Sequence, residues 1–161
     1  MVEVADCVSA ALTIDVPAEE LFAVLADPTT HAAIDGTGWV QEPVDRAPLT
    51  EVGQLFRTDM YHPDARDGDY QVVNQVHVLD APRAIGWRTG YDPEGDGNLE
   101  FGGWFWRYDL EPESPNTTRI ILTYDWSAVP NTIRDHLEFP PFPKIHLPNS
   151  LNHLAALVQG Y

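Results

Sequence analysis

The chain has 161 residues, with 25 acidic and nine basic side chains and a formal net charge of −16 at pH 7. This length suits one domain with a single hydrophobic core, so we expect one domain over residues 1–161. The negative charge repels phosphate backbones and anionic lipid surfaces, which argues against a nucleic-acid partner.

The sequence also bears on the cellular compartment. Cys7 is the single cysteine, which excludes an intrachain disulfide framework and a cysteine zinc site. No charged start precedes an apolar run, as a signal peptide would require, and no apolar run approaches the roughly twenty residues of a membrane span. We therefore expect a cytoplasmic protein without stable membrane insertion.

The first part of the chain predicts one strand followed by two helices. Apolar residues alternate with other side chains from Val8 to Val16, which is the period of a half-buried strand. A helix is predicted from Pro17 to Leu25, because proline suits the first turn and acidic residues follow it. Asp27 and Pro28 end this helix and begin a second, short one that runs to Ile34.

The middle of the chain predicts a loop and then five strands. Glycine and proline recur between Gly36 and Gly53, which is typical of a loop. The strands that follow are separated by short segments rich in proline, glycine and aspartate, so they form an antiparallel meander. Their expected ranges are Gln54–His62, Tyr70–Asp80, Ala84–Tyr91, Leu99–Glu111 and Thr117–Ser127.

The last part of the chain combines a proline-rich approach with an amphipathic helix. One or two helical turns are expected from Asn131 to Leu137, and the run FPPFP at 139–143 is interpreted as a stiff extended bridge, with a proline-motif docking site as the alternative. A helix is predicted from Leu147 to Tyr161, beginning near Pro143 or Pro148 and ending at Gly160. Its apolar stripe consists of Leu147, Leu151, Leu154 and Val158, widened by Leu157.

A strand-rich chain that ends in an amphipathic helix must lay that helix on a sheet. The order of elements resembles the START-like superfamily, also called Bet v 1-like or SRPBCC, and within it the bacterial polyketide cyclase/dehydrase-like branch. The segments that carry the resemblance are IDVPAEELFAVLADPTTH, NQVHVLDAPRAIGW, WRYDLEP, TRIILTYDWS and FPPFPKIHLPNSLNHLAALV. It implies an α+β helix-grip fold, in which a curved six- to seven-stranded antiparallel sheet wraps a long C-terminal helix, with two short helices after the first strand.

The resemblance also implies a cavity between the sheet and the last helix. If the more apolar side of each strand faces inward, the cavity wall is aromatic with a few polar points, as small-molecule sites usually are. Asn74 interrupts an apolar phase, and we expect it to face the cavity. The alternative is that the same residues fill a core. The expected ligand-binding residues are Phe56, Thr58, Met60, Asn74, Val76, Trp87, Trp106, Tyr108, Tyr124, Leu151 and Leu154.

No catalytic residue can be assigned from the sequence. The motifs GxSxG and HExxH and a glycine-rich phosphate loop are absent. His146 and His153 share a helical face but would lie roughly 10.5 Å apart, too far to bind one metal ion directly. The acidic run from Asp92 to Asp96 resembles the start of a calcium loop, but Gly103 stands where the bidentate glutamate is required. We therefore expect no metal and no cofactor.

We predict that the protein binds a small hydrophobic molecule, polycyclic or lipid-like, in this cavity, as in members of the superfamily that carry or transport lipids. The first alternative is a polyketide cyclase or dehydratase, in which a tyrosine or histidine moves protons. The second alternative is a protein-interaction module similar to the co-chaperone-like branch. A homodimer is compatible with the sequence, which does not determine the oligomeric state.

Overall fold

The computed structural model describes residues 2–4, 6–64 and 68–159. Its strands form one eight-stranded sheet in the order β1-β2-β8-β7-β6-β5-β4-β3, and all neighbouring strands are antiparallel. The strands are β1 (Val2–Val4), β2 (Cys7–Ile14), β3 (Val40–Pro43), β4 (Leu55–Tyr61), β5 (Asp69–Asp80), β6 (Ala84–Tyr91), β7 (Glu100–Ser114) and β8 (Thr117–Asp125). The helices are α1 (Ala18–Leu25), the 3-10 helix η1 (Pro28–Thr30), α2 (His31–Ile34), α3 (Asn131–Arg134) and α4 (His146–Gln159).

The first helices form where the sequence places their signals. Pro17 precedes α1, whose first turn carries Glu19 and Glu20 at the positive end of the helix dipole. The Asp27 carboxylate then caps η1 by accepting a hydrogen bond from the Thr29 backbone N–H at 2.9 Å. The predicted strand, two short helices and meander are all present, and the α+β helix-grip class is confirmed.

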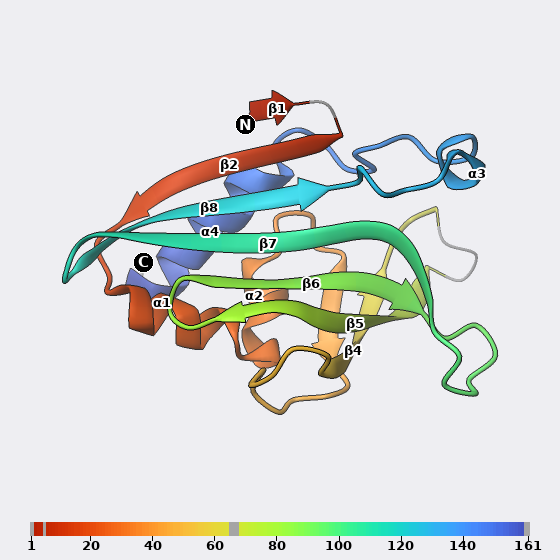
Figure 1. The fold of residues 1–161 in the computed structure, drawn as a ribbon, viewed down its shortest axis with the longest axis horizontal. Coiled ribbons are helices and arrows are strands. Elements are labelled where there is room, and N and C mark those ends of the chain that lie inside the picture. Colours follow the sequence, from red (N-terminus) through yellow and green to blue (C-terminus); the bar gives the residue numbers. More distant parts are fainter. Residues whose placement is uncertain (1, 5, 65–67, 160–161) are drawn as a thin grey trace.

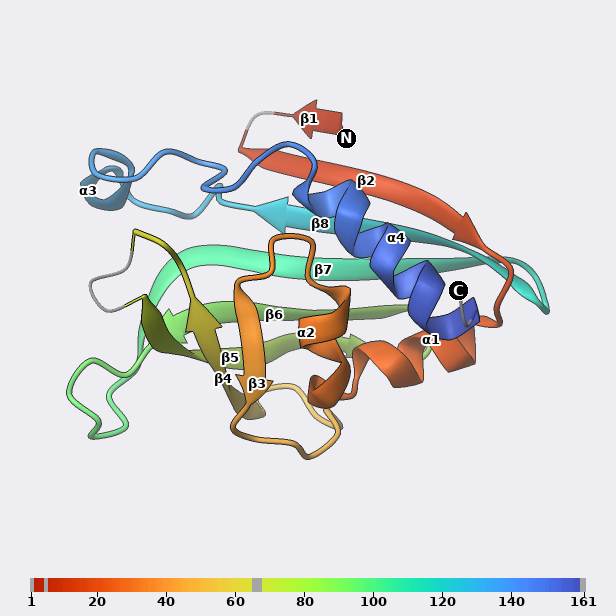
Figure 2. The ribbon, with the colours of Figure 1, turned by 180° about the vertical axis from the view of Figure 1, so that it is seen from behind.

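Helix α4 lies against the concave side of the sheet, as Figures 1 and 2 show from opposite sides. Leu147, Leu151 and Leu154 point into the core and are at most 1% exposed. They pack with residues of β2, β8 and α1, so this end of the molecule is a filled hydrophobic core. Leu157, expected to widen the apolar stripe, is instead 44% exposed. The predicted helix end at Gly160 and Tyr161 lies outside the described residues.

Three details differ from the expectations. The sheet has eight strands instead of six or seven, because two short edge strands, β1 and β3, add to the predicted set. Strand β3 lies in the stretch expected to be a loop, and its four residues are too few for a recognisable alternation. In β5, the register shifts between Val76 and Val78, so that Leu79 packs against the core, whereas strict alternation from Asn74 and Val76 would place Val78 there.

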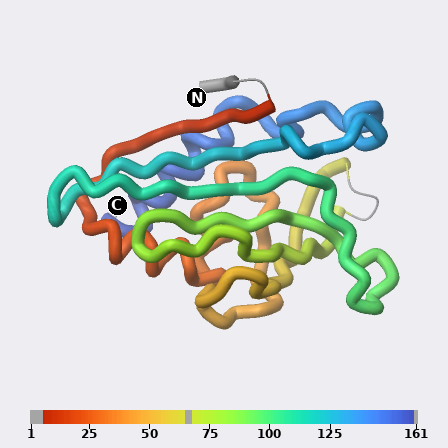
Figure 3. Tube along the Cα trace, in the orientation of Figure 1, coloured from red at the N-terminus to blue at the C-terminus, as the bar shows by residue number. Residues whose placement is uncertain are grey.

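A long connection joins β8 to α4. The trace in Figure 3 leaves the end of β8, turns through α3 and returns toward the sheet before α4 begins. The His146 backbone N–H donates to the Pro143 carbonyl at 3.0 Å, so the first turn of α4 continues directly from the FPPFP run. None of the helices within the described ranges is long and apolar enough to cross a membrane.

Candidate functional site

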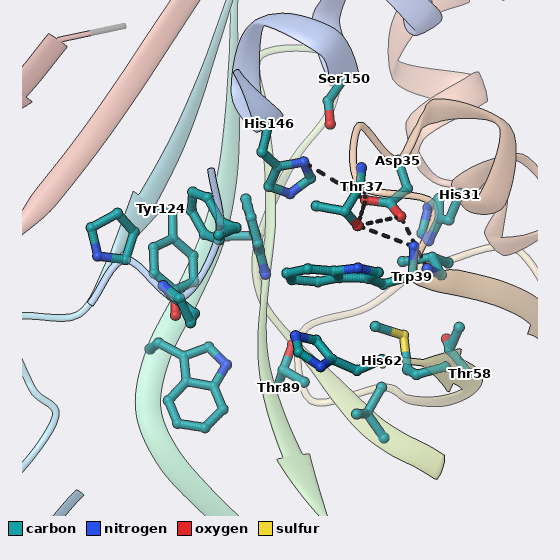
Figure 4. A pocket seen from close by; sticks show the side chains of 18 of the residues that line it. His31, Asp35, Thr37, Trp39, Thr58, His62, Thr89, Tyr124, His146 and Ser150 are labelled. Atoms are coloured by element: carbon teal, nitrogen blue, oxygen red, sulfur yellow. Dashed lines mark hydrogen bonds and ion pairs between the residues drawn. The ribbon is translucent and has the colours of Figure 1, made fainter. Parts of the chain in front are cut away.

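A cavity of about 1000 Å³ opens between the sheet and the segments that cover its concave side. Its walls come from β4 to β8, the connection from α2 to β3, the first turns of α4, and residues 137–143. Pockets that hold drug-sized ligands have volumes of roughly 300–1,000 Å³, so this cavity can enclose a small molecule. It flanks the N-terminal end of α4, and not the middle of that helix (Figure 4).

The sheet side of the cavity is aromatic. Trp87 of β6 faces Trp106 and Tyr108 of β7, and Tyr124 of β8 lies beside Trp106 with ring centroids 4.6 Å apart. Strand alternation places these rings on one face, because they occupy paired positions on neighbouring strands. Flat aromatic faces of this kind favour ring-containing ligands by stacking.

The FPPFP run covers part of this wall. Phe142 stacks on Trp106, with centroids 5.6 Å apart and planes inclined by 27°, and meets Tyr124 edge-on at 4.9 Å. Phe139 stacks on Trp126, with ring centroids 6.4 Å apart, and lies tilted against Trp104 at 6.1 Å. The run is thus an irregular segment that connects β8 to α4. It also lines the cavity.

A short polar ladder crosses the three strands β4, β5 and β6. The Asn74 side-chain amide donates to Thr58 Oγ1 at 3.3 Å, and its oxygen accepts from Thr89 Oγ1 at 2.7 Å. All three side chains line the cavity, and Asn74 is 5% exposed. Asn74 therefore faces the cavity as expected, but its hydrogen bonds are also satisfied by neighbouring strands.

Tyr108 and Tyr124 are 6% and 2% exposed. Burial raises the pKa of both phenols, and the charge of Asp35 adds to the effect on the pKa of Tyr108. Both phenols therefore stay protonated and act as hydrogen-bond donors. Among the described residues neither hydroxyl has a hydrogen-bond partner, and both can donate to a ligand.

One carboxylate faces the cavity from the end of α2. The Asp35 side chain is 7% exposed. It accepts hydrogen bonds from Thr37 Oγ1 at 2.8 and 3.0 Å and from the Val40 backbone N–H at 3.0 Å. This turn geometry is typical of aspartate, whose short side chain can bond to the backbone that follows it. Burial raises the pKa of Tyr70 to about 12, with smaller contributions from Tyr91 and from the charge of Asp35.

His146 is the partner of Asp35 across the cavity rim. Its Nδ1 lies 3.8 Å from Asp35 Oδ1, and the imidazole is 7% exposed. Figure 4 shows the two side chains pointing toward one another. Burial lowers the pKa of His146 below its ordinary value, and the Asp35 charge opposes part of that effect. The cavity therefore contains a buried histidine–aspartate pair within an aromatic lining.

The chain must pass very close to α4 to bring this pair together. The Gly36 backbone N–H donates to Ser150 Oγ at 2.9 Å, and a Cβ at Gly36 would collide with the His146 carbonyl oxygen. His153 Nδ1 lies 3.2 Å from the carbonyl oxygens of Ile34 and Asp35. Glycine at position 36 is therefore required by the close approach of the two backbones.

A second histidine, His31, lies at the start of α2, one helical turn before Asp35, and is half-buried. His31 Nε2 is 2.8 Å from the Leu25 carbonyl oxygen, so Nε2 carries the proton. The ring stacks on Trp87 at 4.9 Å and meets Phe56 edge-on. Burial lowers its pKa, while the Leu25 hydrogen bond and Asp27 act in the other direction. His31 thus supports the position of Trp87 in the wall.

The sequence-predicted site residues fall into two groups. Seven line the cavity: Thr58, Met60, Asn74, Trp87, Trp106, Tyr108 and Tyr124. The other four, Phe56, Val76, Leu151 and Leu154, lie in the hydrophobic core next to it. Sequence reasoning did not assign His31, Asp35, Trp39, Thr89, Phe142 or His146 to the site. The signal in the sequence was the run Asp35-Gly36-Thr37, in which glycine allows close approach and threonine can bond the aspartate.

The two histidines of α4 do not form a metal site. His146 turns into the cavity, whereas His153 is exposed and meets main-chain oxygens. Within the part of the chain that the structure describes, no three His, Cys, Asp or Glu side chains gather closely enough to hold a metal ion. The buried pair is therefore suited to hydrogen bonding or proton transfer rather than to metal coordination.

Comparison with known proteins supports the fold more than any activity. No protein-family model matches the chain. An uncharacterized protein of Mycobacterium tuberculosis, Rv0088, is 30% identical over 132 residues, which cover 82% of this chain and 52% of that protein. The chain thus spans about half the length of the curated relatives that it matches.

Solved bacterial structures share the architecture over nearly the whole chain. Protein NE0264 from Nitrosomonas europaea superposes with a TM-score of 0.70 at 15% identity, covering 99% of this chain and 97% of that one. The AHSA1 protein (SPO3351) from Silicibacter pomeroyi has a TM-score of 0.61 at 21% identity, covering 96% and 99%. At these identities the similarity shows a common fold, an antiparallel sheet with a C-terminal helix.

Proposed function

We propose that the protein binds a small, neutral, ring-containing hydrophobic molecule in the cavity. The observation that carries this proposal is the composition of the wall: four of the five tryptophans, Trp39, Trp87, Trp104 and Trp106, line one open cavity of about 1000 Å³. A packed core would leave no such volume, and all four rings remain partly exposed within the cavity, where a ligand can contact them.

The charges around the cavity favour a neutral ligand. Asp35 is buried at the wall, and among the described residues its hydrogen bonds come from Thr37 and the Val40 backbone and not from a lysine or arginine. The net charge of −16 repels anions before they reach the mouth. Fatty-acid anions should therefore bind more weakly than neutral ring compounds of similar size.

Tryptophan fluorescence titration tests this proposal. Neutral polycyclic phenols and long-chain carboxylates of matched size are added separately to the protein, and quenching is followed to saturation. We expect saturable quenching by the phenols and a weaker response to the carboxylates. The variant Trp106→Leu removes one wall residue and separates quenching in the cavity from quenching at the surface. Tighter binding of the carboxylates at low salt would contradict the electrostatic argument.

A protein-interaction role is the second candidate, because one structural neighbour carries the name AHSA1. Such a role would use an exposed apolar surface. The large exposed apolar residues lie on separate segments: Val44, Val52, Leu55, Tyr61, Tyr91, Leu137, Ile145 and Leu157. Absence of saturable quenching by every ring compound tested would favour this candidate over ligand binding. A cyclase or dehydratase activity remains a proposal that would need turnover of a bound substrate.

A further inference from the structure

The histidine–aspartate pair of the cavity has hydrogen-bonding capacity that the surrounding residues do not use. His146 Nδ1 is buried and has no hydrogen-bond partner within the usual distance among the described residues, although Asp35 Oδ1 is 3.8 Å away. Nδ1 is enclosed by protein whereas Nε2 is not, so a molecule in the cavity can reach the ring at Nε2. Both side chains are 7% exposed, which makes this a built site and not a surface contact.

Asp35 is held in place by other bonds. Its two carboxylate oxygens accept from Thr37 Oγ1 and from the backbone N–H of Val40, so its orientation does not depend on His146. A carboxylate on the Nδ1 side favours the tautomer with the proton on Nδ1. Nε2 is then the unprotonated nitrogen and can accept a hydrogen bond.

The ring of His146 is also fixed by packing. It meets Trp106 edge-on at 5.3 Å and Phe142 edge-on at 4.7 Å. Figure 4 shows one ring nitrogen joined to Asp35 and the other turned away from it, toward the space beside Trp39. The free acceptor therefore faces the volume that the proposed ligand would fill.

We propose that His146 Nε2 accepts a hydrogen bond from a hydroxyl group of the ligand, with Asp35 as the positioning residue. This proposal rests on the proposed function and makes the ligand class narrower: a neutral ring compound with a phenolic or enolic hydroxyl. The aromatic wall contacts the rings of the ligand, and His146 and Asp35 determine which edge of the ligand, the one with the hydroxyl, lies against α4.

Other ligand groups fit this acceptor less well. A carbonyl or ether oxygen has no proton to donate to Nε2. A carboxylate would bring a second negative charge toward Asp35. An ammonium group would lose its hydration inside the cavity, and both oxygens of Asp35 already accept hydrogen bonds.

The test compares naphthol with its methyl ether, which keeps the rings but lacks the proton. Dissociation constants are measured by fluorescence titration for the parent protein and for His146→Phe, which preserves an aromatic ring next to Trp106 and Phe142. Asp35→Asn tests the positioning role, because the amide keeps the size of the side chain but loses its charge. Asn152→Ala is the control, since Asn152 lies on the same helix at an exposed position and does not line the cavity.

We expect naphthol to bind the parent protein and Asn152→Ala about tenfold more tightly than the ether, as for one well-placed hydrogen bond. In His146→Phe the two compounds should bind equally, and in Asp35→Asn the ratio should fall. If naphthol and its ether bound the parent protein with equal affinity, the hydrogen bond from the ligand hydroxyl to His146 would be contradicted, while the cavity would remain a binding site. Saturable binding by neither compound would overturn both proposals.

Discussion

His146 Nδ1 lies 3.8 Å from Asp35 Oδ1, across the junction where the start of α4 meets the end of α2. The contact depends on Gly36, whose missing side chain lets the two backbones approach. It joins the helix-grip architecture to the chemistry of the cavity, because the same junction closes one end of the ligand space.

The core beneath α4 should depend on its buried leucines. Leu154 is fully buried, so Leu154→Ala should lower the free energy of unfolding by about 2–5 kcal/mol through lost burial and a cavity. Leu157→Ala on the same helix, at a position 44% exposed, should change it by about 0.5 kcal/mol or less. Denaturant unfolding measures both variants, and equal effects would contradict the placement of the helix face.

Asn74 should contribute to stability as well as to the cavity wall. Asn74→Leu leaves the hydroxyls of Thr58 and Thr89 without their partner, so we expect a loss of about 1–3 kcal/mol in unfolding free energy. Gln71→Leu is a control on the same strand at an exposed position. If thermal and denaturant unfolding of Asn74→Leu matched the parent protein, the polar ladder would not be a stabilising feature.

Stability should fall with acidification in the range where histidine titrates. Burial lowers the pKa of His31 and of His146 below the ordinary value of 6.5. Between the lowered and the ordinary pKa, the unfolded chain binds more protons than the folded one. Above pH 6.5 the two histidines are neutral in both states and do not lower the free energy of unfolding. As the pH falls below 6.5 toward the folded-state pKa, the free energy of unfolding decreases.

The corresponding measurement is the midpoint of thermal unfolding between about pH 7 and pH 5. His31→Gln should reduce the loss on acidification, whereas His136→Gln, at an exposed position, should leave it unchanged. Burial also lowers the pKa of His77, so His77 adds to the loss of stability on acidification. Some pH dependence of the unfolding midpoint should therefore remain in His31→Gln. An identical slope in His31→Gln and the parent protein would contradict the burial of a neutral His31.

Phe142 should affect ligand affinity through its contacts with the wall. It packs against Trp106, Tyr124 and His146, and aromatic pairs contribute roughly 0.5–1.5 kcal/mol each. Phe142→Ala should therefore weaken binding of a neutral polycyclic phenol by about tenfold. Phe105→Ala, which removes a ring that packs against His77 and does not line the cavity, is the control. Equal affinities of the two variants would show that the FPPFP run is only a connection.

The fold was accessible from the sequence because its signals are local. The alternation from Val72 to Val76 and the stripe through Leu147, Leu151 and Leu154 each report the face of one element. Strand β3 escaped this reasoning, since four residues are too few for a period and proline ends the run. The bulge near His77 moved the inward position from Val78 to Leu79, which no alternation can reveal in advance.

Only part of the candidate site could be predicted from the sequence. Trp87, Trp106 and Tyr124 could be placed because their strands fix the direction of each side chain. The pairing of Asp35 with His146 could not, because it depends on how α2 and α4 meet in space. Leu151 and Leu154 were expected at the ligand, but the core fills that end of the helix and leaves the cavity at its start.

Native mass spectrometry of the freshly purified protein tests the central claim, that the cavity holds a small molecule. The matched variants are Val72→Trp, which places a large ring in the cavity from β5, and Gln71→Trp, which places the same ring on the opposite face of that strand. We expect the parent protein and Gln71→Trp to bind an added neutral polycyclic phenol with one-to-one stoichiometry, and Val72→Trp to lose it. Equal retention of the phenol by Val72→Trp, or no bound species in any of the three proteins, would contradict the account.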